Sequence, residues 1–494
     1  MDYREQAINR IAAIPEKCVW IDNSWVSDEG ESYQILNPAT QEVLKVCSNT
    51  SEDNIEKAIQ SSLRVKNEWR YVDRSQKRMM FQKLISIVEE NKYLLAAVES
   101  LNNGKTIKES LTCDIAELID TFSYYSGELY ENVGEVIQNE NGLMNYTVYE
   151  PVGVVGAIIP WNYPLIMLAW KIAPALATGN VVILKPSELT PISAMILMEM
   201  MKDAGFPAGV VNMVTGDGKV GDYLARSNDV NKIAFTGSIA TGSKIVNASS
   251  NTNLKRVSLE LGGKSPNIVF DDADEEAVIE KVSSGIFFNK GEVCAAGSRL
   301  IIQRDIYGRV IDRIVQKANE IVVGDPFDDN TDMGAIISKK QLNRIRGYIE
   351  KGIEEGATLL CGGSGKIEYE SGVDGNYIRP TIFTNVTKDM TIAKEEIFGP
   401  VLSVIIFDAE EEAIEIANST RYGLVAGVWS KDITRGLRVA SQVDAGTFWI
   451  NDFGMFSCTS PFGGFRQSGW YREKGKEALR LYQEVKSIWM PNGR

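Results

Sequence analysis

Short apolar runs alternate with helical stretches from residue 152 to residue 263, and this alternation limits the possible folds more than any other feature. The runs are VGVVGAII, VVILKP, VVNMVTG, KIAFTGS and KRVSLELGG. Five such strands separated by helices predict a parallel sheet with both faces covered by helices. In sheets of this kind, ligands bind beyond the carboxyl ends of the strands.

The helical stretches between these runs carry start and stop signals. The stretch PLIMLAWKIAPALATG is expected to end at Gly179. The next helix is expected to take Thr190 as its N-cap and Pro191 as its first residue. Two further helices are expected over about 219–228 and from about 239.

The segment from Pro151 to Trp170 is uncharged and long enough to span a bilayer. Its prolines and glycines would leave backbone groups unsatisfied in lipid, so we expect a buried strand, a turn and a helix, and no membrane partner.

Further apolar runs after residue 265 predict a second α/β domain, because helical stretches again separate them. A long helical pattern over 75–101 is expected to pack on the first sheet, while 133–150 and the tail after about 478 fit neither sheet clearly. A chain of 494 residues is long enough for about three domains. The runs are NIVF, SRLIIQ, ATLLCGG, VLSVIIF, LVAGVWS and GTFWIND.

Composition excludes several classes of function. A net charge of -14 argues against a nucleic-acid partner, since the acidic surface repels phosphates. The chain has no histidine, which removes histidine bases, catalytic triads with histidine and imidazole metal ligands. Its six cysteines form no CxxC pair, so we expect no metal site, reduced thiols and a cytoplasmic location. The charged N-terminal residues do not resemble a signal peptide.

Two glycine-rich turns are candidates for binding phosphate. Gly216 to Gly221 matches the pattern GxGxxG but lacks the acidic residue expected about 20 positions later, so an ordinary turn is an even alternative. The segment FTGSIATG is a better candidate, because Gly237 permits a tight turn and Ser238 starts a helix whose free N–H groups attract a pyrophosphate. The alternative is an N-cap serine without a ligand.

The segment LKPSE ends the second strand and places Lys185 and Glu188 at the edge where a nucleotide would lie. A cation and a carboxylate three residues apart suit the two hydroxyls of an adenosine ribose. The carboxylate would repel a 2′-phosphate, which favours NAD over NADP as cofactor. The alternative is an ordinary surface ion pair.

Three residues are candidates for catalysis. Cys294 lies among small residues, where a thiolate nucleophile would be open to a ligand, although most cysteines are simply small buried hydrophobes. Glu260 lies in an apolar segment that would raise its pKa toward neutrality and suit it as a base, unless it faces solvent from a strand. Asn162, between two prolines, could donate to an oxyanion or form an Asx turn.

Together these segments resemble the aldehyde dehydrogenase superfamily, in an ordered set that covers nearly the whole chain. The motifs are NPAT (37–40), PWNYP (160–164), WKIAPALATGN (170–180), LKPSE (184–188), FTGS (235–238), LELGGKSP (259–266), GEVCAAGSR (291–299), KEEIFGPV (394–401), NSTRYGLVAGVWS (418–430) and PFGGFRQSG (461–469).

The resemblance implies a role for each matching residue. Cys294 would be the nucleophile, Glu260 the base that activates water and Asn162 the oxyanion donor. The carboxylate at Glu260 favours a hydrolytic enzyme over CoA-acylating relatives. The presence of Cys294, Glu260 and Asn162 argues against a non-catalytic member of the family, which is the other alternative. NAD would be held by the residues that match the family's cofactor contacts or the glycine-rich turns, namely Ile159, Trp161, Lys185, Glu188, Gly221, Gly237, Ser238, Gly242, Leu261, Glu396 and Phe398.

The resemblance also implies three parts and an oligomer. Residues 1–132 and 151–262 would form an NAD-binding domain and 263–477 a catalytic domain. Residues 133–150 and 478–494 would form an arm that joins subunits into a homodimer or homotetramer.

The substrate would be a small aldehyde that enters along an aromatic tunnel of Tyr163, Trp170, Phe288 and Phe462. Aromatic faces attract cations, and the match looks nearest to betaine-aldehyde and aminoaldehyde dehydrogenases. However, Gly454 follows WINDF where the bacterial betaine-aldehyde enzymes have histidine, and two tunnel positions are Phe where those enzymes often have Trp. A nonspecific tunnel for aliphatic or aromatic aldehydes is therefore the favoured alternative.

Overall fold

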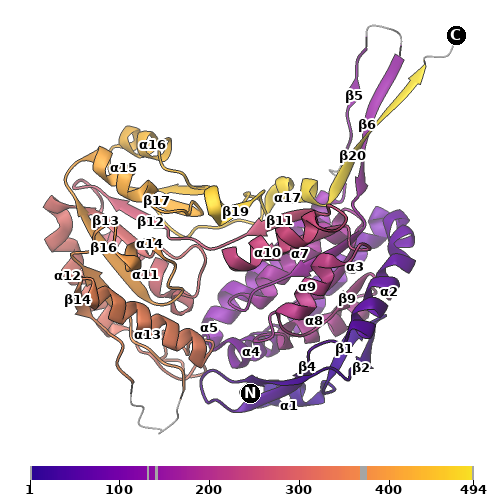
Figure 1. Ribbon diagram of the computed structural model, residues 1–494, viewed down its shortest axis with the longest axis horizontal. Coiled ribbons are helices and arrows are strands. Elements are labelled where there is room, and N and C mark those ends of the chain that lie inside the picture. The colour runs from indigo at the N-terminus through magenta and orange to yellow at the C-terminus, as the bar shows by residue number, and fades with distance from the viewer. Residues whose placement is uncertain (1–2, 131–132, 140–142, 368–374, 492–494) are drawn as a thin grey trace.

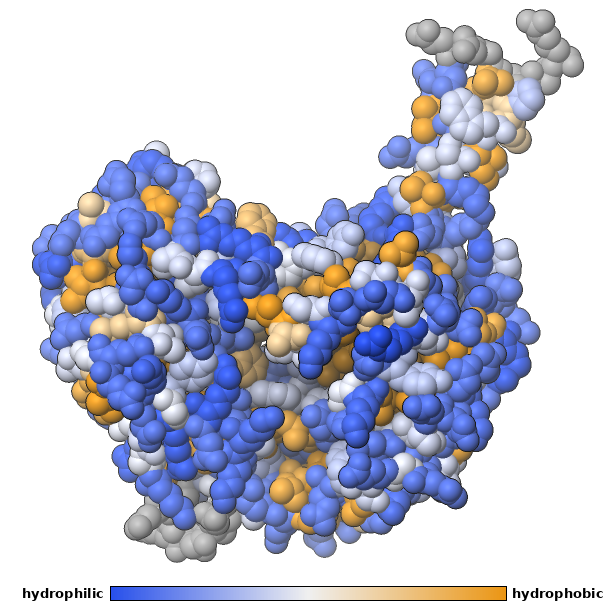
Figure 2. Space-filling view, viewed as in Figure 1, coloured by the Kyte–Doolittle hydropathy of each residue, from blue (hydrophilic) through white to orange (hydrophobic). Residues whose placement is uncertain are grey.

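The computed structural model describes residues 3–130, 133–139, 143–367 and 375–491. Figure 1 shows two α/β lobes side by side and a thin arm that projects from one of them. Each lobe is built on its own sheet, with helices on the faces, as the sequence predicted for an α/β protein. Figure 2 shows that the surface is hollowed between the two lobes.

The first sheet contains the five predicted parallel strands, in the order β11-β10-β7-β8-β9. The chain runs from β7 outward through β8 and β9, and then returns to the other side of β7 to form β10 and β11. The order therefore reverses between β7 and β10, and a crevice opens at such a switch point. The strands are β7 (Val154–Ile158), β8 (Val181–Lys185), β9 (Val211–Met213), β10 (Lys232–Thr236) and β11 (Arg256–Glu260).

Three short strands extend this sheet at its edges. The hairpin of β1 (Cys18–Ile21) and β2 (Ser24–Ser27) joins it through β9, and β19 (Gly469–Trp470) pairs with β11 on the opposite side. Strand β19 lies within 263–477, the range expected to form the second domain, but it belongs to the first sheet.

The helices of the first lobe follow the predicted pattern with one correction. Helix α7 (Pro164–Ala177) ends just before Gly179, whose φ is +88°. Helix α8 (Ile192–Asp203) begins one residue later than predicted, and Thr190 does not cap it, because its hydroxyl donates to the carbonyl of Trp161 instead. Helices α9 (Gly218–Arg226) and α10 (Ile239–Ser250) are where the sequence placed them.

The helical pattern over 75–101 is two helices, α3 (Arg74–Glu90) and α4 (Lys92–Asn103), which meet at Asn91. Both pack on other helices, α3 on α6 and α8 and α4 on α8, while α2 (Glu52–Tyr71) contacts β7, β8 and β9. The prediction that this pattern packs on the sheet was wrong, because a helical period shows that one face is buried but not against which neighbour.

The second sheet has the order β14-β15-β16-β13-β12-β17-β18, with only β14 antiparallel to its neighbour. The sequence predicted six of its strands and missed β15. The strands are β12 (Pro266–Val269), β13 (Arg299–Gln303), β14 (Thr358–Cys361), β15 (Thr381–Thr384), β16 (Val401–Phe407), β17 (Val425–Trp429) and β18 (Thr447–Ile450). The larger helices are α11 (Glu275–Phe287), α12 (Arg304–Glu320), α13 (Lys339–Glu354), α15 (Glu410–Asn418) and α16 (Ile433–Ala440).

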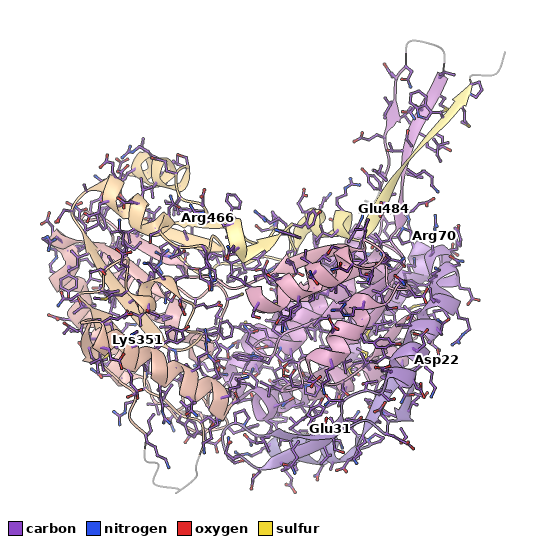
Figure 3. All side chains as sticks on the ribbon, viewed as in Figure 1. Asp22, Glu31, Arg70, Lys351, Arg466 and Glu484 are labelled. Atoms are coloured by element: carbon purple, nitrogen blue, oxygen red, sulfur yellow. The ribbon has the colours of Figure 1, made fainter. Side chains whose placement is uncertain are left out.

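The arm joins the two segments that fitted neither sheet in the sequence. Strand β6 (Leu143–Pro151) pairs along its whole length with β20 (Gln483–Pro491), and β5 (Val136–Ile137) lies on its other side. Arg70 holds the base of the arm through an ion pair of 2.9 Å with Glu150, and Glu484 is paired with Arg256 (Figure 3).

The remaining elements are α1 (Tyr3–Ala13), β3 (Ser32–Leu36), β4 (Val43–Ser48), α5 (Ile107–Glu109), a π-helical segment (Ser110–Ile115), α6 (Ala116–Glu128), α14 (Thr391–Lys394) and α17 (Gly475–Leu481). In the described part of the chain, no helix combines the length and hydropathy that a bilayer crossing requires.

We expect Trp429→Ala to lower the free energy of unfolding by about 3–5 kcal/mol, because truncating a buried aromatic side chain leaves a cavity. The indole is 1% exposed, and its Nε1 donates to Asn267 Oδ1 at 3.0 Å, so the change also removes a buried hydrogen bond. Urea unfolding followed by circular dichroism measures the loss. Trp470→Ala is the control, since Trp470 is 51% exposed, and an equal loss there would contradict the assignment of Trp429 to the core.

Candidate active site

Three neighbouring cavities follow the hollow between the lobes. The outer cavity, of about 1080 Å³, lies at the carboxyl ends of β7, β8 and β10. The inner cleft, of about 240 Å³, shares Trp161, Gly237 and Ser238 with it. The side cavity, of about 510 Å³, shares Tyr163 and Cys294 with the inner cleft. Cys294 therefore lines the two cavities where they meet.

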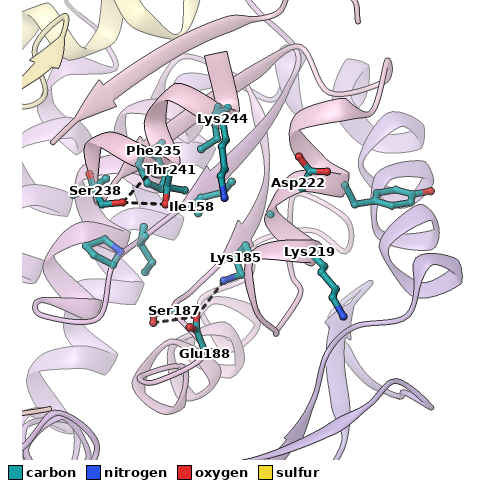
Figure 4. Close-up of a pocket in the computed structure, with 18 of the residues that line it drawn as sticks. Ile158, Lys185, Ser187, Glu188, Lys219, Asp222, Phe235, Ser238, Thr241 and Lys244 are labelled. Carbon is teal, nitrogen blue, oxygen red and sulfur yellow. Dashed lines mark hydrogen bonds and ion pairs between the residues drawn. The ribbon is translucent and has the colours of Figure 1, made fainter. Parts of the chain in front are cut away.

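The outer cavity contains most of the residues predicted to bind a nucleotide. Ser238 caps α10 by accepting the backbone N–H of Thr241 at 3.2 Å, so the positive end of this helix lies at the cavity (Figure 4). Gly237 allows the chain to turn here, since a Cβ would lie 2.5 Å from the ring of Phe235. The other predicted residues on its wall are Ile159, Trp161, Lys185, Glu188 and Gly221.

Lys185 and Glu188 form a loose ion pair across the carboxyl end of β8, with 3.7 Å between Nζ and Oε2. Burial lowers the pKa of Lys185, and the nearby carboxylate of Glu188 opposes that shift. Lys219 and Lys244 also line the cavity, although neither was predicted to bind a nucleotide. A buried cation, an exposed carboxylate and a helix N-terminus are the groups that ribose hydroxyls and a pyrophosphate require.

Gly242 is not among the residues that line these cavities. It is buried on α10, and a Cβ there would lie 3.1 Å from Leu261 Cδ2. The glycine therefore permits α10 to pack closely behind the cavity wall, which is a different role from the contact with cofactor that the sequence suggested.

Leu261, Glu396 and Phe398 lie together on the inner cleft. Glu396 accepts the backbone N–H of Gly263 at 3.0 Å, and burial raises the pKa of its carboxyl group to about 7. The ring of Phe398 packs edge-on against Trp161, with 5.1 Å between ring centroids. These contacts hold Glu396 and Phe398 on the wall of the inner cleft, which Cys294 also lines.

Cys294 follows a short helical turn in which Asn289 and Lys290 have positive φ angles of 44° and 60°. Burial raises the pKa of the Cys294 thiol well above its usual value, and the carboxylates of Glu260 and Glu396 raise it further. The backbone N–H groups of Cys294 and Ala295 act in the opposite direction. A raised pKa disfavours the thiolate, so the Cys294 thiol must lose a proton before it can act as a nucleophile.

Asn162 is held in place by buried polar groups on three sides. Its side-chain Nδ2 donates to the backbone carbonyl of Glu292 at 2.9 Å. Its backbone carbonyl accepts hydrogen bonds of 3.3 Å from the side chains of Asn103 and Asn289. Lys290 in turn donates to Asn103 at 2.8 Å. An amide nitrogen carries two protons, so the second N–H of Asn162 is available to a ligand in the inner cleft, which Asn162 lines.

Glu260 lies at the end of β11 and is 2% exposed. Burial raises the pKa of its carboxyl group well above the usual value, the charge of Glu473 adds to this, and Lys171 and Arg472 oppose it. Lys171 pairs with Glu473 at 2.5 Å and donates to Thr236 at 2.6 Å. Within the described residues, Glu260 Oε1 has no hydrogen-bond partner, so a water molecule or a ligand in the cleft is its natural partner.

The side cavity is walled by all four aromatic residues predicted for the tunnel, Tyr163, Trp170, Phe288 and Phe462. Two of these rings already face a protein cation. Lys105 Nζ lies 4.2 Å from the ring centroid of Tyr163, and Lys474 Nζ lies 4.7 Å from that of Trp170. Several other residues line this cavity but were not predicted, because no local motif marks them, namely Glu117, Asp120, Lys281, Phe453, Phe456 and Lys474.

The described residues hold no cluster of three or more cysteine or carboxylate groups suited to a metal ion. All six cysteines are free thiols.

Known proteins resemble this chain over almost its whole length. Residues 25–488 match the model of the aldehyde dehydrogenase family. Human retinal dehydrogenase 2 is 45% identical over 475 residues, covering 95% of this chain and 91% of that protein. The mitochondrial aldehyde dehydrogenase of Mesocricetus auratus is 42% identical over 475 residues, covering 95% of this chain and 94% of that protein.

Solved structures agree in fold as well. Betaine aldehyde dehydrogenase from Staphylococcus aureus in complex with NAD+ has a TM-score of 0.96 at 37% identity, covering 100% of this chain and 98% of that one. The NAD+ complex of aldehyde dehydrogenase from Bacillus cereus has a TM-score of 0.95 at 42% identity, with 99% of each chain covered. The chain belongs to the aldehyde dehydrogenase family. It is an oxidoreductase that uses NAD to oxidise an aldehyde.

Alkylation of Cys294 by iodoacetamide is expected to be slow at pH 7 and to accelerate as the pH rises beyond 9, because only the thiolate reacts and the pKa of this thiol is raised. Glu260→Gln removes a negative charge that raises this pKa, so the variant should react faster than the wild type at the same alkaline pH. Mass spectrometry of the Cys294 peptide measures the rate, with Cys361 as internal control. Equal rates at Cys294 in both proteins would contradict the coupling.

Proposed function

We propose that Cys294, Glu260 and Asn162 convert an aldehyde and water into a carboxylic acid. The observation that carries this proposal is the position of Cys294, on the shared wall of an aromatic cavity and a cleft that continues into the outer cavity. An aldehyde entering from the side cavity and a nicotinamide in the inner cleft would then meet at one sulfur atom.

The residues present fit NAD. Lys185 and Glu188 would hold the adenosine ribose, Ser238 and the N-terminus of α10 the pyrophosphate, and Glu396 the other ribose, with Leu261 and Phe398 beside the nicotinamide. When bound, NAD supplies the acceptor for the hydride that leaves the aldehyde carbon.

The nucleophile must first lose its proton, because only the thiolate of Cys294 attacks a carbonyl carbon. A water molecule in the inner cleft would carry that proton to solvent, so Glu260 remains available as the base for the hydrolysis step. The thiolate of Cys294 then attacks the carbonyl carbon. The second N–H of Asn162 and the backbone N–H of Cys294 donate to the oxyanion that forms.

Loss of hydride from the thiohemiacetal carbon leaves a thioester on Cys294. Glu260 then accepts a proton from a second water molecule, whose oxygen attacks the thioester carbon. The carbon–sulfur bond breaks, the carboxylic acid leaves, and the departing thiolate takes the proton from Glu260, which restores both the thiol and the carboxylate. The carboxylate at position 260 thus favours hydrolysis over transfer of the acyl group to CoA, which remains the less favoured alternative.

We propose a neutral aliphatic or aromatic aldehyde as the substrate. Aromatic and aliphatic side chains line much of the side cavity, beside two acidic and two basic residues, and two of its rings already face protein ammonium groups. Betaine aldehyde or an aminoaldehyde is the second candidate. It is favoured by the four aromatic positions and by the likeness to the Staphylococcus aureus structure.

We further propose the domain roles that the sequence suggested, with 1–132 and 151–262 binding NAD and 263–477 carrying Cys294. The arm of 133–150 and 478–494 would join subunits into a homodimer or homotetramer, and the exposed apolar side chains of Val136, Val485 and Trp489 on its described part support this. Free thiols fit the proposed cytoplasmic location.

Cys294→Ala is expected to abolish NADH formation from propanal, because no other group can form the thioester. Glu260→Ala should retain a burst of about one NADH per subunit, followed by steady-state turnover slowed by about 10²–10⁴-fold. Stopped-flow absorbance at the NADH band measures both phases. Cys361→Ala, on strand β14, is the matched control. Full steady-state activity in the Cys294 variant would refute the mechanism.

Glu188→Gln is expected to weaken NAD binding by roughly tenfold, since a hydrogen bond to a charged group is lost. The same change should bring NADP binding closer to NAD binding, because the carboxylate no longer repels a 2′-phosphate. The rise in melting temperature with each dinucleotide measures this without turnover. Asp222→Asn, in the same cavity but ion-paired to Arg226, is the control. An unchanged preference in Glu188→Gln would contradict the assignment.

A further inference from the structure

Lys474 places a protein cation in the wall of the side cavity. Its side chain is 2% exposed, and Nζ lies 2.7 Å from Glu117 Oε1. The same Nζ lies 4.7 Å from the ring centroid of Trp170 and 5.7 Å from that of Phe456. Trp170 Nε1 donates to Glu117 Oε1 at 3.0 Å, so the lysine, the glutamate and the tryptophan form one compact group.

The backbone holds Lys474 firmly at this position. Its φ of 63° and ψ of 171° belong to a region that residues other than glycine rarely occupy. The carbonyl of the next residue, Gly475, accepts a hydrogen bond from Tyr125 at 3.1 Å. Glu117 comes from α6, which packs against α7, the helix that carries Trp170. The ammonium group is therefore fixed from both sides rather than free to leave the cavity.

We propose that Lys474, paired with Glu117, occupies the aromatic face that a cationic aldehyde would need, and so commits the tunnel to uncharged aldehydes. This inference rests on the proposed function, and it assigns Lys474 and Glu117 as the residues that determine selectivity for charge.

Attraction between a cation and an aromatic ring requires an open ring face. The ammonium group of Lys474 already lies over the ring of Trp170. The side cavity is lined by two acidic residues, Glu117 and Asp120, and by two basic ones, Lys281 and Lys474. Lys474 balances the charge of Glu117, so the fixed ammonium group removes the attraction that Glu117 would otherwise offer to a cationic substrate and repels such a substrate at the ring.

The experiment uses two aldehydes of the same shape, betaine aldehyde and 3,3-dimethylbutanal. Betaine aldehyde has a positively charged nitrogen where 3,3-dimethylbutanal has a neutral carbon. The measured quantity is the ratio of their kcat/KM values. We expect the wild type to favour 3,3-dimethylbutanal. Lys474→Met should shift the ratio toward betaine aldehyde by roughly tenfold, because the ring face opens and the lining becomes net negative.

Lys476→Met is the matched control, since it removes the same charge two residues away without lining the cavity. Glu117→Gln should shift the ratio in the opposite direction from Lys474→Met, because it leaves the ammonium without its counter-ion. Glu117→Gln/Lys474→Met should lie between the two single variants. Circular dichroism and the melting temperature with NAD establish that each variant is folded.

The outcomes separate this inference from the proposed function. A ratio in folded Lys474→Met equal to that of the wild type, or an equal shift in Lys476→Met, would overturn the inference while oxidation of 3,3-dimethylbutanal still supports the function. A wild type that prefers betaine aldehyde would also overturn it. Failure of the wild type to oxidise any aldehyde would refute the proposed function itself.

Discussion

Parallel pairing of β10 with both β7 and β11 is the constraint on which the rest of the site depends. The pairing places Ile158 beside Phe235 and Thr236 beside Glu260, so three strands end at the same edge of the sheet. The turns that follow these ends carry Asn162, Ser238 and Leu261 into one continuous set of cavities. A single shift of register would move Glu260 away from the cleft, because neighbouring residues of a strand point to opposite faces.

Burial then sets the chemical state of the groups at that edge. The pKa values of Cys294, Glu260 and Glu396 are all raised, with loss of solvent as the largest cause. The charges of nearby carboxyl groups add to the shifts of Cys294 and Glu260, whereas the backbone N–H of Gly263 and nearby cations oppose the shift of Glu396. Burial disfavours the charged carboxylate, so each of these carboxyl groups binds a proton more tightly and is a stronger base than an exposed one. The Lys171–Glu473 ion pair acts on the pKa of Glu260 in both directions, because Glu473 raises this pKa and Lys171 lowers it. Because the chain has no histidine, we assign the role of general base to a carboxyl group.

Local signals predicted most of the fold and much of the site. Apolar runs and glycines marked β7 to β11, and the motifs around Cys294, Glu260 and Asn162 are short enough to be read directly. The errors arose where a local signal had more than one structural solution. The helical pattern over 75–101 broke at Asn91, and Thr190 bonds to Trp161 rather than capping a helix. The side-cavity residues Glu117, Phe456 and Lys474 belong to no motif, so no local pattern indicated that they meet.

The sequence alone determined the class of fold and the types of residue that could carry out the chemistry, because periodicity, capping and motif spacing are properties of neighbours along the chain. Tertiary structure decided which of those residues meet. It placed Cys294 between two cavities, put Gly242 behind the wall instead of on it, and brought Lys474 over Trp170. These outcomes depend on contacts between segments far apart in the chain, whose geometry is fixed only when both sheets and the helices between them are packed.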